Sequence, residues 1–113
     1  MKTLPLAFDK DHFAYAQIDR SPTAAIYSQS QDGKVVAYEV VRIRVKAADE
    51  VMGRQVPERE VYPSSREWGT YGWTYSGHLA KEQAGATYAW LNGGREGERP
   101  DYADAVSRST VAA

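Results

Sequence analysis

Asp32 and Gly33 separate two runs typical of β-strands, and this pair constrains the fold more than any other feature. The runs cover residues 26–31 (IYSQSQ) and 34–46 (KVVAYEVVRIRVK). An Asp-Gly pair between such runs is typical of a two-residue type I′ turn, because both turn residues need positive φ. The chain is therefore expected to be built on an antiparallel hairpin. The turn predicts these facing pairs: Gln31 with Lys34, Gln29 with Val36, and Tyr27 with Tyr38.

The second strand of this hairpin changes phase at Val40-Val41. Apolar residues alternate on one face before the pair and on the other face after it (Val36, Tyr38 and Val40, then Val41, Ile43 and Val45). Either a β-bulge or a passage between two packing environments explains such a switch. We favour the bulge, because it leaves Glu39 on the solvent side together with the basic residues of the strand.

The remaining pattern predicts short elements and one helix. Residues 13–18 and 71–75 are typical of strands, and 47–56 have no clean period and predict a loop, with at most one helical turn. Ser64 and Glu67 have the spacing of a capping box at the start of a single turn. An apolar stripe at helical spacing predicts a helix over 77–92, capped by Ser76.

Together these elements predict an α+β fold, with a three- to four-stranded antiparallel sheet and one C-terminal helix packed on one face. With 113 residues, the chain has room for one globular domain, expected over 1–92. Within it, residues 1–10 are expected to be poorly ordered. No apolar side chain occurs in 92–101, so 93–113 are expected to form a flexible tail.

Composition excludes several classes of site and function. The chain has no cysteine, which excludes disulfide scaffolds and thiolate metal sites. The net charge of −1 gives no global attraction to nucleic acid or membranes. No signal-peptide core is present, so we expect a cytoplasmic protein. No motif indicates a catalytic residue, a bound cofactor or a metal site, and an enzyme is the weakest of the classes considered.

Thirteen aromatic residues, eight of them tyrosine, are many for so short a chain. We expect Trp73 to pack under the helix, where Ala80 and Ala84 leave room for large rings. A protein-binding surface is instead predicted where aromatic residues lie among arginines and beside glycines, a setting suited to interfaces. The residues of this predicted surface are Arg59, Tyr62, Arg66, Trp68 and Tyr71.

Basic residues alternate along the second hairpin strand and suggest a second hypothesis. A nucleic-acid-binding face would consist of Tyr38, Arg42, Arg44 and Lys46. Acidic residues are interleaved with these cations and would weaken the local field, so a solvated outer face is the simpler interpretation.

The block VPEREVYPSS (56–65), followed by WGTYGWTY (68–75), resembles small uncharacterised proteins of bacteriophages and other mobile elements. The resemblance covers about residues 34–91 and brings no functional residue with it. It implies an accessory protein, without a defined activity. We therefore expect a non-enzymatic protein that binds a protein partner. Alternatives are a nucleic-acid-binding module, and a small ligand-binding domain or enzyme with a pocket between sheet and helix.

Overall fold

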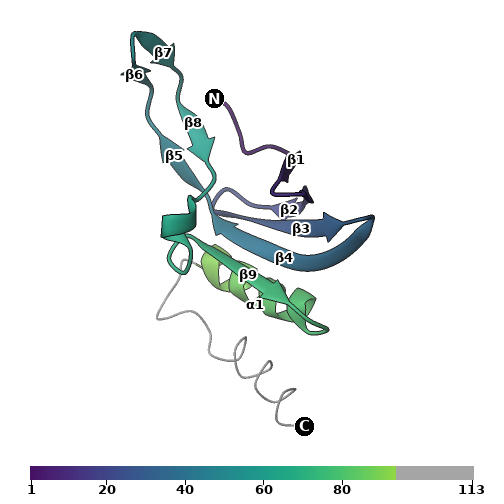
Figure 1. Ribbon diagram of the computed structural model, residues 1–113. Helices are drawn as coiled ribbons and strands as arrows, with labels where there is room; N and C mark the ends of the chain where they lie inside the picture. The colour runs from purple at the N-terminus through teal and green to yellow at the C-terminus, as the bar shows by residue number, and fades with distance from the viewer. Residues whose placement is uncertain (94–113) are drawn as a thin grey trace.

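The computed structural model describes residues 1–93 and has the predicted α+β fold (Figure 1). The sheet is antiparallel with strand order β1-β2-β3-β4-β9, and α1 (Ala80–Asn92) packs on one face. It has five strands rather than three or four: β1 (Ala7–Lys10), β2 (Phe13–Arg20), β3 (Ala24–Gln31), β4 (Lys34–Arg42) and β9 (Gly72–Ser76). The additional strand, β1, lies in the segment 1–10 that we expected to be poorly ordered, and Leu4 there is buried. In the predicted tail, residues 94–113 lie outside the described residues.

The turn between β3 and β4 is the predicted one, with φ of 52° at Asp32 and 80° at Gly33. Gln31 faces Lys34, as expected, but the register then shifts. Ser30 faces Val35 and Gln29 faces Ala37, so Val36 is an extra residue in β4. The predicted pairs Gln29–Val36 and Tyr27–Tyr38 are therefore wrong, because this bulge moves Tyr27 opposite Glu39.

Strand β4 is buried on both faces of the sheet around Val40 and Val41. Val40 belongs to the core under α1, and Val41 belongs to a second core on the opposite face. The predicted bulge at this pair is wrong, since Val40 faces Ile26 and Val41 faces Ala25 without interruption. The alternative explanation of the phase change, a passage of the strand between two packing environments, is correct. As a consequence Glu39 is only 8% exposed and does not lie on the solvent side.

The core under α1 contains Trp73, as predicted. Trp73 and Tyr75 pack with Ala80 and Ala84 of the helix. The Tyr75 hydroxyl lies 2.5 Å from the hydroxyl of fully buried Thr87. The helix begins at Ala80 instead of 77, because Gly77 has φ of 96° and the cap is Leu79 rather than Ser76.

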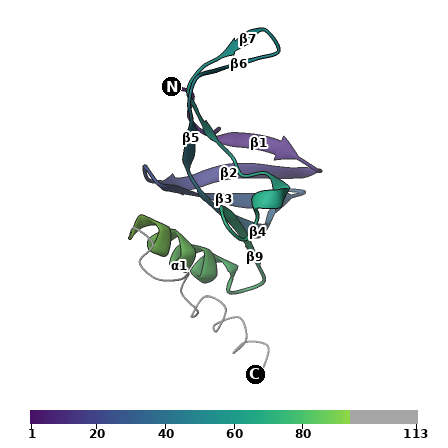
Figure 2. The ribbon, with the colours of Figure 1, turned by 90° about the vertical axis from the view of Figure 1, so that its left-hand side faces the viewer.

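A two-stranded arm extends away from the sheet (Figures 1 and 2). Its lower part pairs β5 (Arg44–Lys46) with β8 (Arg59–Val61), and its upper part pairs β6 (Asp49–Val51) with β7 (Arg54–Val56). The predicted loop over 47–56 is thus wrong. The turn residues Met52 and Gly53 have φ of 52° and 78°, the same conformation as Asp32-Gly33. A Met-Gly pair is not a typical turn signal, so the sequence did not reveal this hairpin.

The N-terminal segment attaches the base of the arm to the sheet. The Glu60 N–H donates to the Lys2 carbonyl at 2.8 Å, and the Leu4 N–H donates to the Glu60 carboxylate at 2.9 Å. The same carboxylate accepts two hydrogen bonds, of 2.7 and 2.9 Å, from the Arg20 guanidinium on β2. Glu60 therefore connects three parts of the chain at one point.

Candidate functional site

The sheet face opposite α1 carries a layer of aromatic side chains. Phe8 stacks on Tyr15 with ring centroids 4.7 Å apart, and Tyr62 meets Phe8 and Tyr27 edge-on at 5.3 and 5.4 Å. The ring centroid of Trp68 lies 6.2 Å from that of Tyr62. These rings come from β1, β2, β3 and the segment after β8, so the layer forms only when distant parts of the chain meet.

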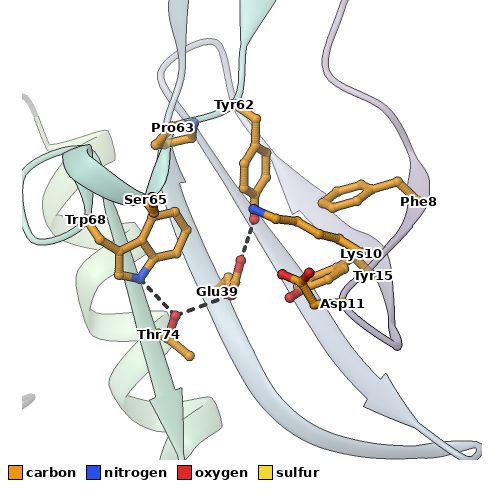
Figure 3. Close-up of a pocket in the computed structure, with 10 residues that line it drawn as sticks. All are labelled: Phe8, Lys10, Asp11, Tyr15, Glu39, Tyr62, Pro63, Ser65, Trp68 and Thr74. Carbon is orange, nitrogen blue, oxygen red and sulfur yellow. Dashed lines mark hydrogen bonds between the residues drawn. The ribbon is translucent and has the colours of Figure 1, made fainter.

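A cavity of about 240 Å³ opens within this layer (Figure 3). Aromatic rings and the carboxylate of Glu39 form much of its wall, while Lys10 and Asp11 at the β1–β2 turn add a charge of each sign. Its lining residues are Phe8, Lys10, Asp11, Tyr15, Glu39, Tyr62, Pro63, Ser65, Trp68 and Thr74.

Glu39 supplies the buried carboxylate of this pocket. The Tyr62 hydroxyl donates to its Oε1 at 2.6 Å, and the Thr74 hydroxyl donates to its Oε2 at 3.3 Å. The Trp68 indole N–H donates in turn to Thr74 Oγ1 at 2.9 Å. Burial, followed by the hydrogen bond to Glu39, raises the pKa of Tyr62 far above its usual value, so Tyr62 remains a phenol that can donate. Burial and the nearby Glu39 charge also raise the pKa of Tyr15.

Local geometry places Trp68 over the pocket. A Cβ on Gly72 would lie 2.7 Å from the Trp68 ring, so only glycine leaves room for the indole on this strand. The segment before Trp68 is the short helix η1 (Ser65–Glu67), which begins with the predicted capping box of Ser64 and Glu67. Glu67 also forms an ion pair with Arg44 at 2.5 Å, which joins η1 to the base of the arm.

A second hollow lies beside the first, where the arm meets the body. This groove of about 400 Å³ is lined by residues of β5 and β8 together with Tyr62 and Glu67. Tyr62 lines both hollows, so the pocket and the base of the arm adjoin at this side chain.

The structure brings together only part of the predicted protein-binding surface. Tyr62 and Trp68 line the pocket. Arg59 lies on β8, where its guanidinium donates to the Pro57 carbonyl at 3.2 Å, and Arg66 is exposed on η1. Tyr71 precedes β9 and is half-buried, with the guanidinium of Arg44 only 4.0 Å from its ring centroid.

The predicted nucleic-acid face is divided in the structure. Tyr38 packs beside the core under α1, and it lies four residues from Arg42, roughly 13 Å along β4. Arg42 and Arg44 lie over the ring of Tyr71, at 5.0 and 4.0 Å from its centroid. Lys46 is exposed on the arm. The basic residues are thus neighbours, but their proposed aromatic partner Tyr38 lies elsewhere.

Phe8, Tyr15 and Glu39 line the pocket but were not among the site residues predicted from the sequence. Glu39 was assigned to solvent because of the bulge expected at Val40-Val41. The available signal was its position in a strand with apolar residues on both faces, where a charged side chain needs a polar partner. Phe8 was missed because its segment was expected to be poorly ordered.

Within residues 1–93, no cluster of three or more His, Asp or Glu side chains is arranged to hold a metal ion. In the same part of the chain, no helix has the length and apolar character needed to cross a membrane. Searches against protein-family models, curated proteins and solved structures found no significant match to this chain. The site must therefore be interpreted from its own geometry.

Proposed function

We propose that the protein is a non-enzymatic binding protein that recognises a protein partner with its arm and the adjoining aromatic pocket. The observation that carries this proposal is the apolar tip of the arm, where Met52 is 97% exposed. Val45 and Val51 on the same arm are about half exposed. Exposed apolar side chains on a projecting element do not contribute to the core, whereas they gain free energy when a partner covers them.

Charge favours a protein over a nucleic acid as the partner. Between residues 44 and 61 the arm carries four basic and four acidic side chains: Arg44, Lys46, Arg54 and Arg59 against Asp49, Glu50, Glu58 and Glu60. A phosphate backbone is bound mainly through an excess of positive charge. Arg44 is in addition paired with Glu67. The arm therefore has no net field for nucleic acid, while its exposed methionine and valines are suited to an apolar patch on a protein.

We infer from the sequence pattern of residues 34–91 an accessory or host-modulating role in the cytoplasm, of the kind expected for small proteins of bacteriophages and mobile elements. In such a role the chain would bind a host protein and alter its activity, without chemistry of its own. A small ligand is the second candidate function, and the 240 Å³ pocket with its buried carboxylate favours it.

Photo-crosslinking in cells tests the protein partner. A photoreactive residue at position 52 is expected to give a discrete adduct with one protein. The same residue at position 85, on the exposed side of α1, serves as the control. Met52→Asp should remove the partner from co-purification while the fold is retained. Equal adducts at both positions would contradict the proposal. A salt-sensitive mobility shift of nucleic acid by the protein would instead favour the predicted nucleic-acid-binding face.

A further inference from the structure

We propose that the aromatic pocket binds a primary alkylammonium cation of about the size of a lysine side-chain end. This inference does not depend on the proposed protein partner, because the ligand can be tested as a free small molecule. It follows from the buried carboxylate, the aromatic wall and the volume of the pocket.

The carboxylate of Glu39 has acceptor capacity to spare. Among residues 1–93, each of its oxygens accepts one hydrogen bond, whereas a carboxylate offers about four lone-pair sites. The Tyr62 hydroxyl, which donates to Glu39, can also accept a hydrogen bond through its oxygen. An ammonium group carries three donors and no acceptor, so it matches these convergent acceptors. Hydrogen bonds of this charged kind are about twice as strong as neutral ones.

The walls favour a cation over a neutral ligand. Phe8, Tyr15, Tyr62 and Trp68 all line the cavity, and a cation within about 6 Å of an aromatic ring face is attracted by the ring quadrupole. The same rings remove water from the surroundings of Glu39, which strengthens its attraction for a positive group. A neutral alcohol of the same shape would gain only the apolar contacts.

The volume limits the size of the ligand. Pockets for drug-sized molecules measure about 300–1,000 Å³. At about 240 Å³, this pocket is smaller than that range and suits one short chain with its charged end. Nucleotides and most organic cofactors are too large to be enclosed.

The charges of Lys10 and Asp11 modulate the affinity in opposite directions. Both residues line the pocket, so Asp11 adds attraction for a cation while Lys10 repels it. Removal of the Lys10 charge should therefore strengthen binding, which is an unusual expectation for the loss of a lining side chain. Loss of the Glu39 charge should weaken it.

Titration of the full chain with n-butylammonium, followed by amide and indole NMR, tests the proposal. We expect saturable shifts at the Trp68 indole and at Tyr15 and Tyr62, with a Kd on the order of 1 mM. Butan-1-ol has the same shape without the charge, and tetramethylammonium has the charge without N–H donors. Both compounds should bind at least about tenfold more weakly than n-butylammonium. Equal binding of either compound, or no saturable shift with n-butylammonium, would overturn the proposal.

Variants separate the pocket from general effects of charge. Glu39→Gln keeps an acceptor oxygen for the Tyr62 hydroxyl, while its NH2 group can donate to the Thr74 oxygen. It should weaken the binding of n-butylammonium by about tenfold. Glu82→Gln, on the exposed side of α1, removes the same charge elsewhere and should leave the affinity unchanged. Lys10→Ala removes a positive charge from the pocket lining and should bind n-butylammonium a few-fold more tightly. If Glu39→Gln does not fold, the Lys10→Ala result still decides, because unchanged or weaker binding there contradicts the charge argument.

Discussion

Gly72→Ala is expected to destabilise the protein through the Trp68 ring. Gly72 does not have positive φ, so alanine is compatible with its backbone, but its Cβ would lie 2.7, 2.8 and 2.9 Å from three ring carbons of Trp68. Favourable carbon–carbon contacts begin near 3.5 Å, so the indole must retreat by about 0.8 Å. That displacement lengthens the 2.9 Å hydrogen bond from the Trp68 indole to Thr74.

The expected cost can be worked out from three contributions. Forcing a methyl group against a packed ring costs about 1–3 kcal/mol. A weakened hydrogen bond costs about 1 kcal/mol. Replacing glycine by alanine restricts the unfolded chain and returns about 0.4–1 kcal/mol. The free energy of unfolding should therefore fall by about 2 kcal/mol, which lowers the urea midpoint by about 1 M.

Urea denaturation followed by tryptophan fluorescence measures this change. Gly85→Ala is the matched control, because Gly85 lies on an exposed turn of α1 with no atom near the added Cβ. There the substitution should stabilise the protein by about 0.5–1 kcal/mol through helix propensity. The two glycine-to-alanine changes should thus have opposite signs.

A double-mutant cycle decides whether the ring is the cause. When Trp68 is already alanine, Gly72→Ala should cost nothing or become slightly stabilising, because the obstacle has gone. If the two costs simply add, the contact between Gly72 and Trp68 does not govern this strand, and the reasoning is refuted.

Three further predictions concern other parts of the fold. Thr87→Val removes the buried hydroxyl beside Tyr75 and should lower the free energy of unfolding by about 1–2 kcal/mol, as measured by urea denaturation; an unchanged midpoint would contradict this role. The Arg44 ion pair, with the Ser64 N–H, lowers the pKa of Glu67 from 4.5 to about 2. Because the folded pKa lies below the unfolded one, the resulting stability is present above pH 4.5 and is lost as the pH falls towards 2. Carboxyl-carbon NMR should show the Glu67 pKa rising when Arg44 becomes alanine, and an unchanged value would refute the pairing. Gly33→Val places a β-branched residue at φ of 80° and should cost about 2 kcal/mol in thermal or urea unfolding, whereas near-normal stability would argue against the type I′ turn.

Elements held by local interactions could be predicted from the sequence. The Asp32-Gly33 turn, the capping box at Ser64 and the helix ending at Asn92 depend on residues only a few positions apart. Their signals survive without knowledge of the rest of the chain. The α+β class follows from these elements, because one helix and a few strands can bury their apolar faces in few ways.

The features that were missed depend on contacts between distant segments. Glu39 becomes a buried site residue only because Tyr62, 23 positions later, reaches it across the sheet. The two-sided burial of Val40 and Val41 likewise requires the N-terminal segment to cover the second face. Alternation along one strand cannot distinguish a bulge from a sheet covered on both sides. The arm was missed for a different reason: its turn contains Met52 at positive φ, a conformation in which methionine is uncommon.

The attachment of the arm through Glu60 has a consequence for the order of folding. The arm and the β3–β4 hairpin each close within a short stretch of chain, so both can form early. The contacts of Lys2 and Leu4 with residues 58–60 join parts of the chain about 56 positions apart. Closing so long a loop is entropically slow, and we expect it to come late. The arm should therefore form as a hairpin first and take its fixed direction only in the last step, when the N-terminal segment docks.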